Sequence, residues 1–226
     1  MSTLNGQTLS ERQKGLAACA CLMAQSDLER LEPAVRQALD NGVTINELKE
    51  AFSQLYAYTG FPRSLNALGV LSKVLENRQP NWLEGKPWTR PAEWDDARKA
   101  YELGVNNQTQ LSGRPFDYAF CPQDDYYLKS HLFGDIFAGD QLSAADREIV
   151  TVAALSGLEG VSPQLAAHKQ GAVNMAMRRN SSMNSVPGST ARAIPYVVNG
   201  RKVSPIRVMR SISSATATWP LWTEEL

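Results

Sequence analysis

Residues 41–62 read NGVTINELKEAFSQLYAYTGFP, and this stretch decides the fold class. Thr44 and Glu47 have the spacing of a capping box, in which a hydroxyl and a carboxylate satisfy the free amides at the start of a helix. The sequence Gly60-Phe61-Pro62 predicts a turn with its proline at the first position of the following helix. The stretch therefore predicts two consecutive helices, over residues 45–58 and 62–76.

Helical spacing also extends upstream of this stretch. Ser10 opens the segment Leu9–Gln25, whose apolar residues recur every three to four positions. Asp27 is a candidate cap for a helix over Leu28–Asp40, and Asn41-Gly42 is a suitable stop because both residues tolerate positive φ. Apolar and polar residues do not alternate with period two over any useful length here. The first half is therefore predicted to be all-α.

The region 77–123 has a different composition. It contains five prolines and three of the five tryptophans, which favours a strap packed over a helical core, with one helix over about 92–103. Beyond it, helical patterns return. They predict helices over residues 124–137, 144–157 (capped by Ser143) and 162–175 (opened by Ser162-Pro163).

An internal repeat relates the two helical regions. Sliding the chain by 133 residues superposes Leu9-Ser10 on Leu142-Ser143 and gives seven identities over 35 positions. The predicted helix boundaries coincide as well, which indicates a tandem duplication. The predicted organisation is a first repeat (1–76), a Pro/Trp-rich connector with one helix (77–123), the first half of a second repeat (124–177) and an atypical tail (178–226).

The tail differs from the rest of the chain in charge. Residues 1–177 carry 16 basic and 21 acidic side chains, whereas residues 178–226 carry 7 and 2 and are rich in serine. Pro187 lies where the offset places the interior of a helix, which it would break. We therefore expect a foreign ending, from a shifted reading frame or a fusion, that leaves the second repeat incomplete. A strand pair around Asn199-Gly200, formed by 197–198 and 203–209, is the one element expected there.

Overall composition excludes several classes of protein. The chain has 226 residues, formal net charge zero and pI ≈ 6.7, which gives no general attraction to nucleic acid or membranes. It has no apolar run long enough to span a bilayer, no secretory signal pattern at its polar N-terminus, and an odd number of cysteines, three. A cytoplasmic protein is expected. No phosphate-binding glycine loop or metal-ligand motif is present, so no cofactor and no metal are expected.

Several ordered motifs resemble one family. Residues 41–44, Glu50, Gln54, Tyr58 and 60–62 resemble the second half of a carboxymuconolactone decarboxylase domain. Residues matching its first half are His131, 133–137, 147–153 and the Leu165-x-x-His168 pattern. The resemblance covers roughly residues 9–76 and 125–176. It implies the all-α, AhpD-like helical bundle, here tandem duplicated with an incomplete second repeat, and an assembly of six domains, which two domains per chain would make a homotrimer.

The peroxidase branch of this family uses a Cys-x-x-Cys-x-x-x-His motif. When His168 is aligned with the histidine of this motif, Val161 and Gln164 occupy the positions of its two cysteines. Cys19 and Cys21 do not replace this pair, because side chains two residues apart on a helix point away from each other. We expect buried, inert cysteines and no thiol peroxidase mechanism.

The decarboxylase branch needs no thiol, metal or organic cofactor. It removes a carboxylate whose electrons pass into an adjacent unsaturated lactone, so it requires a site for a dianionic acid and a proton donor. The resemblance places His168 at the position of the family's helix histidine and Glu148 at that of its glutamate, where a carboxylate can hold the histidine tautomer. The expected function is decarboxylation or a related reaction of a small unsaturated acid or lactone.

Five further residues are expected to bind the substrate. They are His131, Asp135, Glu50, Gln54 and Tyr58. Without a second half-repeat, we expect the pocket at His168 to be open. Simpler roles remain for these residues: a solvated histidine, a glutamate complementing a helix dipole, or an interhelical polar contact. Two other functions also remain, a degenerate alkylhydroperoxidase-like antioxidant and a non-enzymatic oligomeric binding or scaffold protein.

Overall fold

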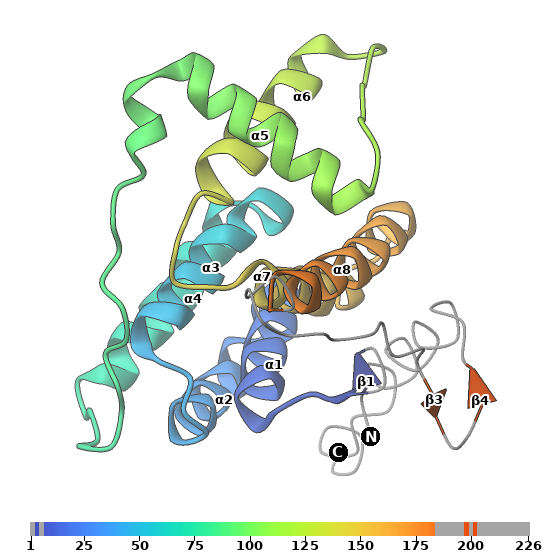
Figure 1. The fold of residues 1–226 in the computed structure, drawn as a ribbon. Helices are drawn as coiled ribbons and strands as arrows, with labels where there is room; N and C mark the ends of the chain where they lie inside the picture. Colours follow the sequence, from blue (N-terminus) through green and yellow to red (C-terminus); the bar gives the residue numbers. More distant parts are fainter. Residues whose placement is uncertain (1–2, 5–6, 184–196, 199–200, 203–226) are drawn as a thin grey trace.

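The computed structural model describes residues 3–4, 7–183, 197–198 and 201–202, and its architecture is all-α (Figure 1). This confirms the predicted fold class and is consistent with the AhpD-like helical fold. Two short hairpins, of two residues per strand, accompany the helices: β1 (Thr3–Leu4) with β2 (Gln7–Thr8), and β3 (Val197–Val198) with β4 (Arg201–Lys202). The helices of the first repeat are α1 (Glu11–Gln25), α2 (Leu28–Asp40), α3 (Ile45–Thr59) and α4 (Phe61–Leu75). The later helices are α5 (Ala97–Ser112), α6 (Pro122–Tyr127), the π-helix η2 (Leu128–Ile136), α7 (Ala144–Ser156) and α8 (Ser162–Met183).

Polar caps fix the starts of the helices. The Thr44 hydroxyl accepts a hydrogen bond from the Glu47 amide, and the Glu47 carboxylate accepts one from the Thr44 amide, as the capping box predicts. Ser10 forms an equivalent box at α1 with Gln13. The predicted boundaries of the first four helices are confirmed to within about two residues, because each follows from local chemistry at its ends.

The helix predicted over 92–103 is wrong in its bounds. A short 3-10 turn, η1 (Ala92–Asp95), comes first, and α5 begins only at Ala97. Asp96 separates the two because its side chain accepts hydrogen bonds from the amides of Arg98 and Lys99. At the other end α5 extends to Ser112, where Gly113 adopts a left-handed conformation (φ 76°) and ends it.

The segment predicted to be helical over 124–137 changes helix type midway. The α-helical turns of α6 continue directly into η2. Helices of the π type are rare, and they occur frequently at functional sites. In η2 the wider turn accompanies a close approach to α5, since a Cβ added at Gly104 would lie 1.6 Å from the Lys129 carbonyl oxygen.

The helix predicted over 162–175 is longer than expected. Helix α8 continues to Met183, past the point where the composition changes. The pair β3–β4 encloses Asn199-Gly200, but its second strand is 201–202 rather than 203–209. The expectations for residues 184–196, 199–200 and 203–226, including the break at Pro187, lie outside the described residues.

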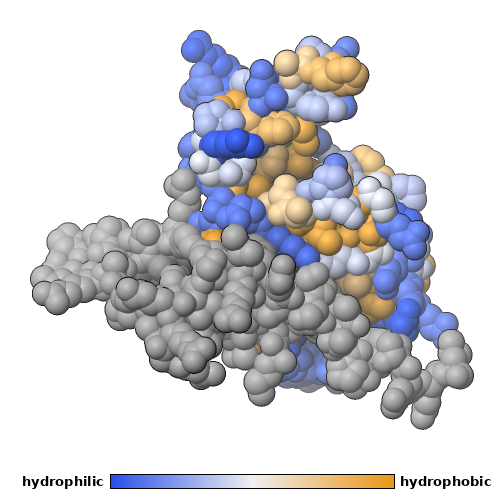
Figure 2. Space-filling view, turned by 90° about the vertical axis from the view of Figure 1, so that its right-hand side faces the viewer, coloured by the Kyte–Doolittle hydropathy of each residue, from blue (hydrophilic) through white to orange (hydrophobic). Residues whose placement is uncertain are grey.

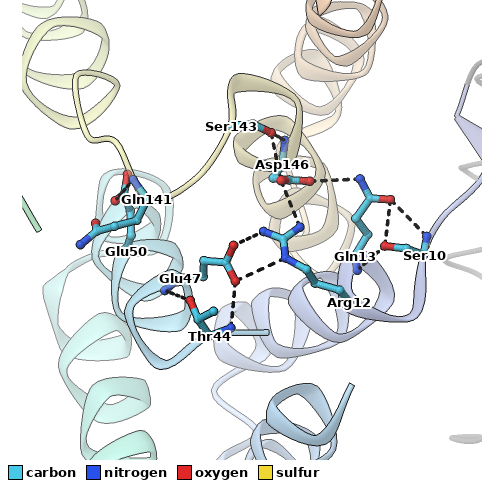
Figure 3. Close-up of polar contacts among 9 residues, drawn as sticks. All are labelled: Ser10, Arg12, Gln13, Thr44, Glu47, Glu50, Gln141, Ser143 and Asp146. Atoms are coloured by element: carbon cyan, nitrogen blue, oxygen red, sulfur yellow. Dashed lines mark hydrogen bonds and ion pairs between the residues drawn. The ribbon is translucent and has the colours of Figure 1, made fainter. Parts of the chain in front are cut away.

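Residues related by the 133-residue offset contact each other between α1 and α7 (Figure 3). Helices α1 and α7, which the 133-residue offset superposes, pack against each other. Gln13 and Asp146 are also equivalent under this offset, and the Gln13 Nε2 donates to Asp146 Oδ1 at 3.0 Å. Arg12 joins the pair, bonding to Asp146 Oδ2 at 3.1 Å and to Glu47 on α3. A contact between equivalent positions is what a near-twofold relation between two copies produces.

The helices form two groups around separate apolar clusters. The larger cluster lies among α1, α2, α3, α4 and α7, and the smaller one contains Leu111, Leu132, Phe133 and Met175 from α5, η2 and α8. Figure 1 shows α5 and α6 above the helices of the first repeat. Tyr58, on α3, packs against both clusters, so α3 is the element that joins them.

The connector is a packed strap, as predicted. In Figure 1 it extends along one side of the molecule from the end of α4 to the start of α5. Trp82 is buried, and its indole nitrogen donates to Asp40 Oδ1 at 2.7 Å. The carbonyl oxygens of Leu83 and Glu84 accept from the first amides of α3 at 3.0 Å. The strap therefore closes the N-terminus of the helix that carries several candidate site residues.

Within the described parts of the chain, no helix is long and apolar enough to cross a membrane. Hydrophobic residues are nevertheless exposed in the upper part of the molecule (Figure 2), which in Figure 1 contains α5, α6 and the segment between them. Phe116, Phe120 and Tyr127 are exposed there, with Phe120 at 91%.

Candidate functional site

His168 and Glu148 form a buried pair between α8 and α7. The Nδ1 atom of His168 lies 3.0 Å from Glu148 Oε2. Glu148 is fully buried and His168 is only 7% exposed. The second glutamate oxygen, Oε1, is buried and has no hydrogen-bond partner among the described residues. A buried carboxylate that hydrogen-bonds to an imidazole fixes the orientation of the ring.

Tyr58 covers the histidine from the first repeat. Its ring meets that of His168 edge-on, with 5.2 Å between centroids. Burial raises the pKa of the Tyr58 phenol well above its usual value of 10, and the nearby Glu148 carboxylate raises it further. The phenol is therefore neutral at physiological pH. This contact also corrects the expectation of an open pocket at His168, because α3 of the first repeat covers the ring.

A buried polar layer connects α3 with α7. Gln54 Nε2 donates to Thr151 Oγ1 at 2.8 Å and to the Arg147 carbonyl oxygen at 3.2 Å. The Arg147 guanidinium donates to Gln54 Oε1 at 2.9 Å and forms an ion pair with Glu50. Glu50, Gln54 and Tyr58 are spaced four residues apart, so they share the face of α3 that meets α7.

Arg147 keeps its charge despite its burial. Burial lowers the pKa of its guanidinium to about 10, which is still far above neutrality. Glu50 supplies the opposite charge, and the backbone amide of Gln141 donates to Glu50 Oε2 at 3.1 Å (Figure 3). Gly139 permits this arrangement: a Cβ there would lie 2.3 Å from Glu50 Oε1 and 2.6 Å from Arg147 Nη2.

A second histidine–carboxylate pair lies on η2. His131 Nδ1 is 2.7 Å from Asp135 Oδ2, and both side chains are partly exposed. The pair lines an open cavity of about 1090 Å³ between α3, η2, the start of α7 and the strap. The polar layer forms one wall of this cavity, through Glu50, Gln54 and Arg147.

The predicted site residues thus fall into two groups. His168, Glu148 and Tyr58 contact one another in the interior. His131, Asp135, Glu50 and Gln54 line the cavity, whose wall does not include the first group. Arg147 and Glu148 are neighbours in sequence but serve different groups, because successive helix positions point in different directions.

Sequence reasoning missed the contribution of the strap to the cavity. Trp88, Trp94 and Arg90 line it, and the two indole rings lie 5.7 Å apart. The cluster of tryptophans between prolines is the sequence signal for this wall of the cavity. Arg147 pairs with Glu50, which lies on α3 and far away in the sequence, so no local sequence pattern indicates this pair.

Cys19 has the buried environment expected of an inert thiol, whereas Cys21 and Cys121 are less buried. Cys19 is fully buried, and burial raises the pKa of its thiol to about 12. Cys21 is half-buried and burial raises its pKa too. All three cysteines are free. Among the described residues, no three His, Cys, Asp or Glu side chains are grouped to hold a metal ion.

Comparison with known proteins identifies a family for the first repeat. Residues 1–73 match the model of the carboxymuconolactone decarboxylase family. The matched region contains α1 to α3 and most of α4, including Glu50, Gln54 and Tyr58. A comparison with curated proteins finds no match. The match confirms the resemblance in this part of the chain, which carries Tyr58, whereas the resemblance of residues 125–176 stays a prediction.

Proposed function

Because residues 1–73 belong to the carboxymuconolactone decarboxylase family, we propose that the chain is an acid–base enzyme of this type, acting on a small unsaturated carboxylic acid or lactone. The observation that carries the proposal is the contact of 3.0 Å between His168 Nδ1 and Glu148 Oε2 in the interior. A histidine with an adjacent carboxylate is a common device for proton transfer near neutral pH.

The proposed reaction is a decarboxylation. The bond between the substrate carbon and its carboxylate breaks, carbon dioxide leaves, and the electron pair passes into the unsaturated lactone. His168, as the imidazolium, then donates the proton on Nε2 to carbon, while Glu148 holds the proton on Nδ1. Tyr58, neutral at physiological pH, excludes water from one side of the ring. Glu50, Gln54, His131 and Asp135 line the separate cavity and are not part of this proposed reaction centre.

The alternative of a thiol peroxidase has less support. Val161 and Gln164 occupy the positions of the redox pair, and burial keeps the Cys19 thiol protonated. The second alternative is a non-enzymatic binding protein. The exposed aromatic side chains near α6 favour it, because exposed apolar patches mark interaction surfaces.

The test compares three forms of the full chain. Carbon dioxide release is measured with a panel of unsaturated lactone acids, using the natural sequence, a variant with all three cysteines replaced by serine, and His168→Gln. We expect the cysteine-to-serine variant to release carbon dioxide as the natural sequence does. In His168→Gln the rate of release should fall at least about a hundredfold. Peroxide consumption that disappears with the cysteines would favour the antioxidant alternative, and no turnover of any substrate would favour a binding protein.

We further propose that the chain self-associates as a homotrimer in the cytoplasm. The exposed aromatic residues support self-association, and the free thiols of Cys19, Cys21 and Cys121 suit a reducing compartment. Light scattering at micromolar concentration tests the assembly. A mass of three chains is expected, and a monomer would contradict it.

A further inference from the structure

The cavity between α3, η2 and the strap has no role in the proposed reaction, although the chain forms it from four separate segments. Its volume of about 1090 Å³ lies slightly above the range of roughly 300 to 1,000 Å³ that is usual for small-molecule sites. A small unsaturated lactone would leave most of this space to water. The size of the cavity therefore suits a larger ligand than the acid proposed for His168.

The strap gives the cavity an aromatic wall. The Trp88 and Trp94 rings are 5.7 Å apart and inclined by 50°, and Trp88 is 54% exposed, so its ring surface is accessible. Exposed indole rings cost free energy in water and bind flat apolar groups well. The Trp94 Nε1 atom is buried and has no hydrogen-bond partner among the described residues. This nitrogen is a donor that lacks an acceptor.

The charges in the cavity wall set a limit on the charge of the ligand. Three cations line the cavity, and each already has a carboxylate partner. Lys49 lies 3.5 Å from Glu84, Arg90 lies 2.7 Å from Asp95, and Arg147 pairs with Glu50. Asp135 adds a further carboxylate beside His131. A dianion would have to displace these partners, whereas a ligand with one negative charge or none would not.

From these observations we infer that the cavity is a binding site for a planar, ring-containing ligand with one carboxylate or a neutral carbonyl. The ring lies against Trp88, and the acceptor oxygen takes the hydrogen bond of Trp94 Nε1. His131, oriented by Asp135, lines the same cavity. The site is distinct from the His168–Glu148 pair, and its existence does not depend on the proposed reaction.

Calorimetric titration of the full chain tests this inference. The probes are naphthoate, a planar monoanion, and maleate, a small dianion without a ring. We expect naphthoate to bind at least about tenfold more tightly than maleate. Trp94→Phe keeps the ring and removes the donor, so it should weaken naphthoate binding about fivefold. Trp88→Ala removes the stacking surface and should weaken it about tenfold.

Two variants serve as controls. Phe120→Leu removes an aromatic side chain that is more exposed than Trp88 but lies outside the cavity, and it should leave binding unchanged. His168→Gln should bind naphthoate as the natural sequence does, which separates this site from the proposed reaction centre. Tighter binding of maleate, or naphthoate binding that neither tryptophan variant weakens, would overturn the inference.

Discussion

His168 and Glu148 are 20 residues apart in sequence, yet Nδ1 of the first lies 3.0 Å from Oε2 of the second across the α7–α8 interface. An ionised carboxylate can only accept a hydrogen bond, so the imidazole donates from Nδ1 and leaves Nε2 as the basic atom. The pair therefore determines which histidine nitrogen is available for proton transfer. Glu148 acts as a positioning residue in this account, and His168 as the residue that meets the substrate.

The tautomer of His168 can be measured directly. The chain has two histidines, so nitrogen NMR of histidine-labelled protein resolves both rings. We expect neutral His168 to carry its proton on Nδ1, and Glu148→Gln to shift the population toward Nε2–H because an amide can also donate. Glu159→Gln, which changes an exposed carboxylate near the start of α8, should leave the spectrum unchanged. An Nε2–H tautomer in the natural sequence would contradict the assignment.

The Glu50–Arg147 pair is expected to contribute strongly to stability. Glu50→Gln leaves the buried guanidinium without its counter-charge, which should lower the free energy of unfolding by about 3 kcal/mol. Urea denaturation measures the change. Glu32→Gln breaks an exposed pair with Lys73 and should leave the transition midpoint nearly unchanged. Equal effects of the two substitutions would show that burial does not strengthen the inner pair.

Gly139 is expected to be intolerant of a side chain. In Gly139→Ala the new methyl group would overlap Glu50 Oε1 and Arg147 Nη2, so the ion pair must move. We expect a loss of about 2 kcal/mol in stability and weaker naphthoate binding, since both residues line the cavity. Gly69→Ala, in the interior of α4 with nothing within 4 Å of its Cβ, should instead stabilise the chain slightly. A neutral Gly139→Ala would contradict the close packing.

Cys19 should make stability depend on alkaline pH. Its thiol has a pKa of about 12 in the folded state against 9.0 in the unfolded chain. Between these values the unfolded state binds fewer protons than the folded state, so stability present below pH 9 is lost as the pH rises. The expected slope is about 1.4 kcal/mol per pH unit.

Denaturation at a series of pH values checks this slope. Cys19→Ala should remove most of it, while the slope of Cys121→Ala should equal that of the natural sequence, because Cys121 lies outside the main core cluster. A slope that Cys19→Ala does not reduce would assign the alkaline sensitivity to other groups, such as Tyr58.

The parts of the fold that follow from local chemistry were predictable. Ser10, Thr44 and Ser143 mark helix starts by their own hydrogen bonds, and those starts are found where expected. The bounds of α5 were missed because Asp96 was interpreted as an interior residue rather than a cap. The π-helix could not be predicted, since its wide turns are stabilised by packing on α5 and not by a sequence pattern.

The site was predictable only in part, for a similar reason. His168 and Glu148 were identified from their positions in family motifs, and their contact follows from the packing of α8 on α7. The role of Arg147 depends on Glu50, a residue of the other repeat, and such a long-range pair leaves no local signal. The same holds for Trp88 and Trp94, which line the cavity only because the strap folds back over α3.

Proton transfer to carbon is the most direct test of the central claim. The substrate that releases carbon dioxide is incubated with the full chain in deuterated water, and the product is examined by NMR and mass spectrometry. The account predicts one deuterium on a carbon of the conjugated lactone system that receives the electron pair, formed at a rate that falls at least about a hundredfold in His168→Gln and in Glu148→Gln. An undiminished rate of deuterated product in both variants would contradict it.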